Sequence, residues 1–156
     1  MKALILYDSY FGNTEKVAQA IADAFAPRAE VTLARVKPYS PEQLEGVNLL
    51  VLGSPTRGFR PSEATQAFLN ALPAGSLEGI HAAAFDTRVD PQRIDSKMLK
   101  FMAKTFGNAD KPMLTALEKK GARIVSTGQG FIVLGSEGPL LDGELERAAA
   151  WAATLL

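Results

Sequence analysis

The feature of this chain that most constrains its fold is an alternation of short, unbroken apolar runs with longer segments of helical periodicity. The runs lack the period-two alternation of strands with one wet face, so they predict parallel strands covered on both faces. They are Ala3–Tyr7, Leu49–Leu52, Ala82–Phe85 and Ile124–Val125. A weaker, alternating run at Val31–Val36 is typical of an edge strand, which brings the predicted number of strands to five.

Helical patterns separate these runs. The clearest one begins behind Asn13 or Thr14, either of which would cap the helix, and the last one begins behind Asp142. A further pattern follows Pro61, and two helical pieces between Pro91 and Gly121 are separated around residues 107 and 108. Alternation of strands and helices implies right-handed crossovers and an open α/β sandwich, in which ligands bind beyond the carboxyl ends of the strands.

Composition excludes several functional classes. The 17 basic residues balance the 17 acidic ones, so the charge favours neither a nucleic-acid binder nor an acidic tail. The chain has no cysteine, which excludes disulfides, thiolate nucleophiles and iron–sulfur ligation. Its one histidine, His81, is too few for HExxH zinc motifs. Any redox chemistry must therefore come from a bound cofactor.

Length and the first residues predict one cytoplasmic domain. A chain of 156 residues with 47% hydrophobic content supplies one core, so we expect a single domain over residues 1–156. The first apolar stretch ends at Tyr7 and Asp8, which is too short for a signal peptide or a membrane span. We expect a cytoplasmic location, no membrane span and no nucleic-acid partner.

The turn after the first predicted strand has the outline of an anion site. It reads DSYFGNTE from Asp8 to Glu15 and leads into the clearest helical pattern. Serine, asparagine and threonine side chains can donate hydrogen bonds, the glycine allows close approach of the backbone, and the first amides of a helix are free for a ligand. Such a loop would hold a phosphate without a lysine or an arginine. The alternative is an ordinary capped turn.

This loop resembles the phosphate loop of the flavodoxin family, which reads Ser/Thr-x-Thr-Gly-Asn-Thr where this chain has Ser-Tyr-Phe-Gly-Asn-Thr. Phe11 replaces a hydroxyl donor, and an aromatic before the glycine is similar to related quinone-reducing, flavodoxin-like enzymes. The resemblance extends from Lys2 to the final helix and implies FMN as the cofactor. The residues that it places at the phosphate are Ser9, Tyr10, Phe11, Gly12, Asn13 and Thr14.

The second candidate loop runs from Gly53 to Ser62, where a flavodoxin has a loop that flanks one face of the isoalloxazine ring. Reduced flavin carries a hydrogen at N5 and needs an acceptor, which a glycine peptide can present by rotating at little steric cost. We nominate the Gly58–Phe59 peptide for this role. Phe59 either covers the ring or packs beneath its own loop. The implied site residues here are Pro55, Thr56, Arg57, Gly58 and Phe59.

The third candidate loop follows the fourth strand and contains Asp86, Thr87 and Arg88, at the position of the other flavin-flanking loop but without the Gly-Asp and Tyr usual there. The resemblance implies that the amides of Thr87 and Arg88 bind the pyrimidine edge of the flavin. The Arg88 guanidinium would then lie near N1 and O2 and stabilise the fully reduced cofactor. The alternative is a solvated Arg88 paired with Asp86 or Asp90.

Two further patterns fit competing interpretations. Gly128 and Gly130 begin a dinucleotide-type motif, but the third glycine does not follow on spacing and no helix opens there. An apolar cluster after Asp95 favours helical packing into the core, with an exposed partner or quinone surface as the alternative. Its members are Met98, Leu99, Phe101, Met102 and Phe106.

The sequence therefore predicts an α/β, flavodoxin-like three-layer sandwich. Its five-stranded parallel sheet has the order 2-1-3-4-5, with helices on both faces. The resemblance implies an FMN-binding electron-transfer protein whose partners are redox proteins, namely a reductase or ferredoxin-type donor and an acceptor enzyme. Two alternatives stay open: an FMN-dependent oxidoreductase acting on a quinone or porphyrinogen-like substrate, and a non-redox module that has lost FMN, which the Phe11 substitution supports.

Overall fold

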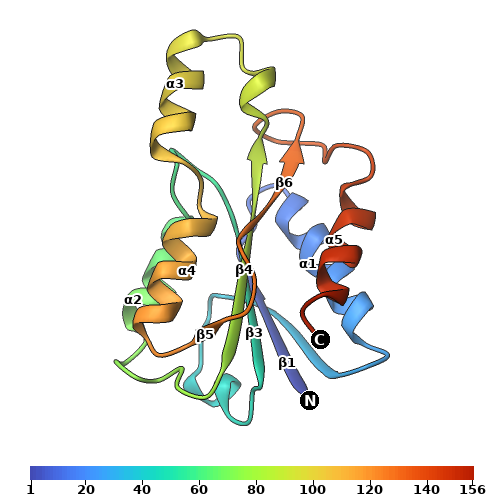
Figure 1. Ribbon diagram of the computed structural model, residues 1–156, viewed down its shortest axis with the longest axis vertical. Coiled ribbons are helices and arrows are strands. Elements are labelled where there is room, and N and C mark those ends of the chain that lie inside the picture. The colour runs from blue at the N-terminus through green and yellow to red at the C-terminus, as the bar shows by residue number, and fades with distance from the viewer.

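The computed structural model describes residues 1–156 as a parallel sheet between two layers of helices (Figure 1). The strands run in the order β2-β1-β3-β4-β5, which is the predicted order, and a sixth strand also pairs with β4. The strands are β1 (Lys2–Tyr7), β2 (Glu30–Arg35), β3 (Leu49–Pro55), β4 (His81–Val89), β5 (Arg123–Ile124) and β6 (Gln129–Val133). The helices are α1 (Asn13–Phe25), α2 (Glu63–Ala71), α3 (Lys97–Phe106), α4 (Asp110–Lys119) and α5 (Glu144–Ala153), with short 3₁₀ helices at Pro41–Leu44 and Pro91–Arg93.

The core lies on both faces of the sheet. Helices α1 and α5 cover one face and α2 and α4 cover the other (Figure 1). Successive residues of a strand point to opposite faces. Leu4 and Leu6 therefore join the core beneath α2 and α4, whereas Ala3 and Ile5 join the core beneath α1 and α5. Two buried faces explain why the strand sequences are unbroken apolar runs.

The edge strand β2 is confirmed. It pairs with β1 alone, and its first residues alternate between exposed and half-buried positions. The sixth strand, β6, was not predicted, and β4, at His81–Val89, is longer than the predicted apolar run. Residues 81 and 82 of β4 pair with β5, and residues 85–89 pair with β6. Two short strands thus share the edge beside β4.

The predicted helix caps are wrong. Helix α1 is capped by Gly12 rather than by Asn13 or Thr14, and α5 by Gly143 rather than by Asp142. Both glycines have positive φ, 90° at Gly12 and 89° at Gly143, a conformation that costs glycine little. The polar residues that follow Gly12 lie inside the first turn, where their side chains hold other segments.

The predicted burial of the apolar cluster in α3 is also wrong. No residue of α3 is buried, and the helix stands beyond the carboxyl end of the sheet, near the top of Figure 1. Its length of 10 residues, and that of every other helix, is too short to cross a membrane.

The carboxyl ends of three strands meet at one level of the sheet. Tyr7 of β1 is in register with Gly53 of β3, which is in register with Phe85 of β4. A Cβ atom on Gly53 would lie 2.1 Å from Cζ of the fully buried Phe85 ring, so only glycine fits there. This register brings the segments that follow the three strands to one edge.

Candidate functional site

A cavity of about 270 Å³ opens at this edge, beyond the carboxyl ends of β1, β3 and β4. All of the predicted site residues line it apart from Gly12, Phe59 and Asp86. Three residues that were not predicted also line it. The complete lining is Ser9, Tyr10, Phe11, Asn13, Thr14, Pro55, Thr56, Arg57, Gly58, Thr87, Arg88, Val89, Val133 and Ser136.

The first segment presents free amides to the cavity. Gly12 N donates to Ser9 Oγ at 3.0 Å, and Gly12 O accepts the first helical hydrogen bond from Lys16 N at 3.1 Å. No hydrogen bond within the protein uses the backbone N–H groups of Tyr10, Phe11, Asn13, Thr14 and Glu15. Free amides at the positive end of a helix dipole suit a phosphate group, so the cradle fits the phosphate ester of FMN.

Two predicted donors of this loop are used to hold the site together. The Thr14 hydroxyl lies 2.8 Å from that of Thr87 on β4, and both residues are buried. Asn13 Nδ2 donates to the carbonyl of Glu137, in the loop after β6, at 3.0 Å. The Ser9 hydroxyl accepts from the Gly12 amide, so its own proton remains free to donate.

Arg57 brings a cation to the loop that was predicted to work without one. Its guanidinium carbon lies 4.9 Å from the centre of the Tyr10 ring and 5.7 Å from that of Phe11. The side chain forms no ion pair, so its charge is available to the cavity. Arg57 follows Phe11 by 46 positions in the sequence, so only the fold shows that the two residues are neighbours.

The second segment makes a tight turn at the mouth of the cavity. Arg57 and Arg60 exchange two backbone hydrogen bonds, of 2.8 and 3.1 Å. Between them, Gly58 and Phe59 both have positive φ, 54° and 67°. The Phe59 ring packs against Phe106 of α3, with ring centres 5.8 Å apart, and does not line the cavity. Of the two predicted positions for this ring, the structure therefore shows packing beside its loop.

The third segment is not a loop, contrary to the prediction. Asp86, Thr87 and Arg88 belong to β4, where residues 86–88 pair with β6. Thr87 and Arg88 line the cavity, but Asp86 is 0% exposed and does not. The strand continues because β6 supplies a partner for it, and this strand was missed in the sequence.

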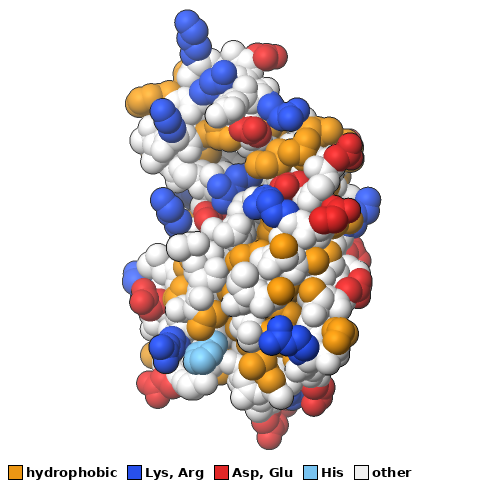
Figure 2. All heavy atoms as spheres, turned by 45° about the vertical axis from the view of Figure 1, so that its right-hand side comes forward, with side chains coloured by type: hydrophobic (Ala, Val, Ile, Leu, Met, Phe, Trp, Pro, Cys, Tyr) orange, Lys and Arg blue, Asp and Glu red, His pale blue; other side chains and the backbone are white.

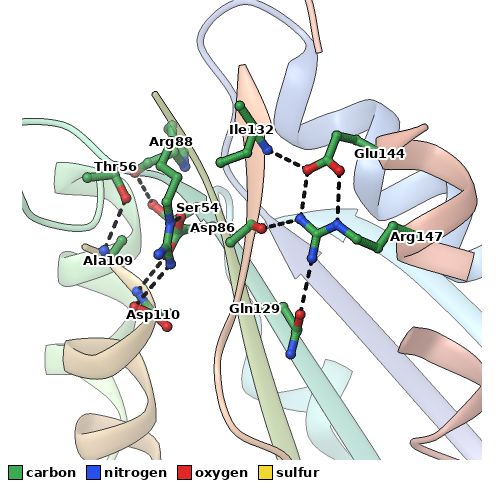
Figure 3. A network of polar contacts seen from close by, with 12 residues as sticks. Ser54, Thr56, Asp86, Arg88, Ala109, Asp110, Gln129, Ile132, Glu144 and Arg147 are labelled. Atoms are coloured by element: carbon green, nitrogen blue, oxygen red, sulfur yellow. Dashed lines mark hydrogen bonds and ion pairs between the residues drawn. The ribbon is translucent and has the colours of Figure 1, made fainter. Parts of the chain in front are cut away.

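Asp86 and Arg88 form a buried ion pair beside the cavity (Figure 3). Arg88 Nε and Nη2 donate to the two Asp86 oxygens at 2.7 and 2.6 Å, and the Asp110 amide donates to Asp86 Oδ2 at 3.1 Å. Arg88 Nη2 also lies 3.4 Å from Asp110 Oδ1. The pairing of Arg88 with Asp86 was the alternative interpretation, but the arginine is only 20% exposed instead of solvated.

Gly128 and Gly130 make room for this network. A Cβ atom on Gly130 would lie 2.1 Å from Arg88 Nε, and one on Gly128 would lie 2.4 Å from Asp110 Oδ2. Contacts this short are not found between real atoms, so a side chain at either position would displace the ion pair. The glycine pair that resembled a nucleotide motif thus seats Arg88 and Asp110.

The positive charge of Arg88 is largely neutralised within the protein, so little of it acts on a ligand. Burial raises the pKa of the Asp86 carboxyl from 3.8 to about 6, an effect that the hydrogen bonds and charge of Arg88 oppose. Burial disfavours the Arg88 charge as well, but Asp86 and Asp110 outweigh it and raise the pKa of the guanidinium. Because one cation faces two carboxyl groups, Arg88 is already compensated inside the protein.

A second network fixes β6 against α5 (Figure 3). Glu144 Oε2 accepts from the Ile132 amide at 2.6 Å, and Glu144 also binds Arg147, whose hydrogen bond is the main cause of its lowered pKa. Arg147 in turn binds the Gly130 carbonyl and lies over the Phe131 ring, 4.6 Å from its centre.

Three unpredicted residues line the cavity: Val89 at the end of β4, and Val133 and Ser136, which the fixed position of β6 brings there. Val89 and Val133 are in register where β4 pairs with β6, and Ser136 lies in the turn that follows. The only signal in the sequence was the glycine-rich stretch after residue 134, which reads GSEG.

Comparison with known proteins supports the family. The flavodoxin family model matches residues 5–151. Oxidised Flavodoxin 2 from Bacillus cereus superimposes with a TM-score of 0.74 at 26% identity, covering 99% of this chain and 97% of that one. For oxidised Flavodoxin 1 from the same organism the values are 0.74, 22%, 99% and 96%.

The flavodoxin of Streptococcus pneumonia TIGR4 shares 16% identity with a TM-score of 0.74 and coverages of 99% and 97%, which shows a common fold alone. No curated protein matches the chain. The family match nevertheless spans nearly the whole sequence, and it agrees with the strand order and with the cradle at the start of α1. The chain belongs to the flavodoxin family.

Proposed function

We propose that this chain is an electron carrier that binds FMN in the cavity and exchanges electrons with redox proteins by brief docking. As a flavodoxin, it is an FMN-binding electron-transfer protein in general terms. The observation that carries the finer proposal is the lining of the cavity. The cavity has free amides at the start of α1 on one side and opens between the carboxyl ends of β3 and β4 on the other.

In this proposal each segment has a separate task. The Ser9 hydroxyl and the free amides of Tyr10, Phe11, Asn13 and Thr14 hold the phosphate ester. The turn at Pro55–Gly58 and the β4 residues Thr87 and Arg88 flank the ring system, and the Gly58–Phe59 peptide remains our nominee for the N5 acceptor. The chain binds, orients and shields the cofactor, and FMN supplies the one- and two-electron chemistry.

Arg57, rather than Arg88 as the sequence suggested, is the residue that we propose stabilises the negative charge of the reduced cofactor. Arg88 is compensated by two carboxyl groups, whereas Arg57 forms no ion pair and is exposed at the cavity. A free cation there favours an anionic ligand and the more negatively charged, fully reduced cofactor. We therefore propose that Arg57 tunes both affinity and potential.

A second candidate function is an FMN-dependent oxidoreductase for a quinone or a porphyrinogen-like substrate. It is favoured by a mostly apolar hollow of about 580 Å³ that has Tyr10 in common with the FMN cavity. The apolar lining of this hollow includes Val36, Tyr39, Ala64, Ala67, Phe68 and Ala71. Rapid oxidation of NAD(P)H by a quinone, without a separate reductase, would favour the enzyme over the carrier.

The test of the main proposal is titration of the purified apoprotein with FMN, followed by stepwise reduction of the complex. We expect a one-to-one complex with a shifted flavin spectrum and two one-electron couples that differ from those of free FMN. Reduction should be fast only through a ferredoxin or a flavoprotein. A colourless protein that FMN cannot reconstitute would overturn the proposal and would favour a module that has lost the cofactor.

The role of Arg57 gives a separate prediction. Arg57→Gln should weaken FMN binding roughly fivefold, about 1 kcal/mol, and lower the potential of the couple that yields fully reduced FMN, because the exposed cation at the cavity is gone. Fluorescence titration and spectroelectrochemistry measure the two effects. Arg60→Gln is the matched control, since Arg60 sits at the other base of the same turn and does not line the cavity. Equal effects of both substitutions would contradict the assignment.

A further inference from the structure

Helix α3 carries an uncompensated positive charge. Its ten residues include Lys97, Lys100 and Lys104 and no acidic residue, and none of these lysines forms an ion pair. Lys97 stands in the first turn, where the helix dipole disfavours a cation. Lys104, in contrast, stands in the last turn, where a cation is favourable, so in a chain of zero net charge the three lysines are a local excess that the helix dipole explains only in part.

The helix that carries the lysines also carries exposed apolar side chains. Met98 and Phe101 are 68% and 69% exposed, and Phe106 is 63% exposed. Met102 and Ala103 are half-buried and mark the side of α3 that faces the molecule. At 100° per residue, the opposite side carries Lys97 and Lys104 with Phe101 between them and Lys100 beside them. Figure 2 shows basic and hydrophobic side chains together at the upper end of the molecule.

The carboxyl end of α3 contacts the turn at the mouth of the cavity through the side of the helix opposite the lysines. The Phe106 ring at the end of α3 packs on Phe59, which follows Gly58 of the cavity lining. The turn that contains Gly58 adds two exposed arginines, Arg57 and Arg60. A protein that lay across α3 and this turn together would therefore bring its own redox centre close to the flavin site.

We propose that α3 and the turn Arg57–Arg60 form the docking face for an acidic redox protein of the ferredoxin type. This inference rests on the proposed function and names the partner class. Lysines steer an anionic surface toward the cavity, and Phe101 and Met98 supply the apolar contact. Each docked ferredoxin gives up one electron and becomes oxidised by one electron, so two encounters supply two electrons.

A protein fits this face better than a lipid surface does. A helix that lies in a bilayer interface turns its apolar side to the lipid and keeps its lysines on the other side. In α3 the outermost ridge is lysine, and the side of Met102 and Ala103 is turned toward the molecule. The test must therefore distinguish binding of an acidic protein from binding of an anionic membrane.

The test measures binding of an acidic [2Fe–2S] ferredoxin by calorimetry, with the FMN-loaded and the FMN-free protein. Reversal of the three α3 lysines (K97E, K100E and K104E together) should weaken binding at least about tenfold and flatten its salt dependence. The control reverses three exposed cations elsewhere, Lys16→Glu, Arg28→Glu and Lys119→Glu, with the same change in net charge. We expect it to weaken binding less than about threefold. The double variant M98S/F101S should also weaken binding while keeping the salt dependence.

Three results would overturn the proposal. The first is that the ferredoxin does not bind, and the second is that the α3 variant and the control lose affinity equally. The third is that the wild type binds phosphatidylserine vesicles while its affinity for the ferredoxin is unchanged by the substitutions in α3. Circular dichroism confirms that each variant is folded. Because binding is measured without FMN as well, a failure of docking is distinct from a failure of the proposed function, which the FMN titration alone decides.

Discussion

Arg88→Ala is expected to destabilise the protein by about 3–5 kcal/mol at pH 8, because it leaves the carboxylate of Asp86 buried without a cation. Asp86 is 0% exposed and takes two of its three side-chain hydrogen bonds from Arg88. Only the Asp110 amide would remain as a donor. The free energy of unfolding from urea denaturation measures the loss.

The loss should shrink at pH 5. In the wild type the pKa of Asp86 is about 6 in the folded state and 3.8 ordinarily, so the folded protein holds the proton more tightly. Its contribution therefore favours folding below about pH 4 and is lost as the pH rises through 6, a difference of about 3 kcal/mol. Without Arg88 the folded pKa rises further. At pH 5 the carboxyl is then neutral in the folded variant, and no buried charge lacks a partner.

Two comparisons isolate this effect. Arg93→Ala removes an exposed arginine that lies 3.9 Å from Asp90, and we expect a loss below about 1 kcal/mol at either pH. Asp86→Asn introduced into Arg88→Ala removes the buried charge and should restore part of the stability at pH 8. A loss from Arg88→Ala that is the same at pH 5 and pH 8 would show that the buried carboxylate is not the cause.

Most of the sheet could be predicted because its signals are local. Unbroken apolar runs report burial on both faces, and four of them became β1, β3, β4 and β5. The strand β6 was missed although its residues Phe131–Val133 are an unbroken apolar run, which follows Gly130, a position where a side chain would collide with Arg88. The exposure of α3 could not be predicted either, because helical periodicity reports an apolar side and not whether anything covers it.

The parts of the candidate site that consist of consecutive residues could be predicted, whereas the contacts between residues far apart in the sequence could not. The loop from Ser9 to Thr14 was identified because a cradle of amides is built from consecutive residues. The cation over that loop, Arg57, comes from the turn after β3. The compensation of Arg88 depends on Asp110, which is 22 positions away in the sequence. Such pairings join segments that are distant in the sequence and meet only in the folded chain.

The cradle itself gives the largest expected effect on ligand binding. Ser9→Asp places a carboxylate where the Ser9 hydroxyl now accepts from the Gly12 amide, among the free amides at the start of α1. We expect FMN affinity to fall by two to three orders of magnitude. Two like charges about 4 Å apart in a partly buried site repel each other by about 4 kcal/mol. Titration of the apoprotein, followed by flavin fluorescence, gives the dissociation constants.

Riboflavin has the same ring system without the phosphate, so its binding distinguishes repulsion of the phosphate from general damage to the site. Its affinity should change less than about threefold in Ser9→Asp, since no phosphate meets the new carboxylate. Ser9→Asn is the matched control: it has the size of aspartate and no charge, so FMN should keep most of its affinity. If FMN and riboflavin lost affinity equally in Ser9→Asp, the turn between β1 and α1 would not be the phosphate cradle, and the placement of FMN in this cavity would have to be abandoned.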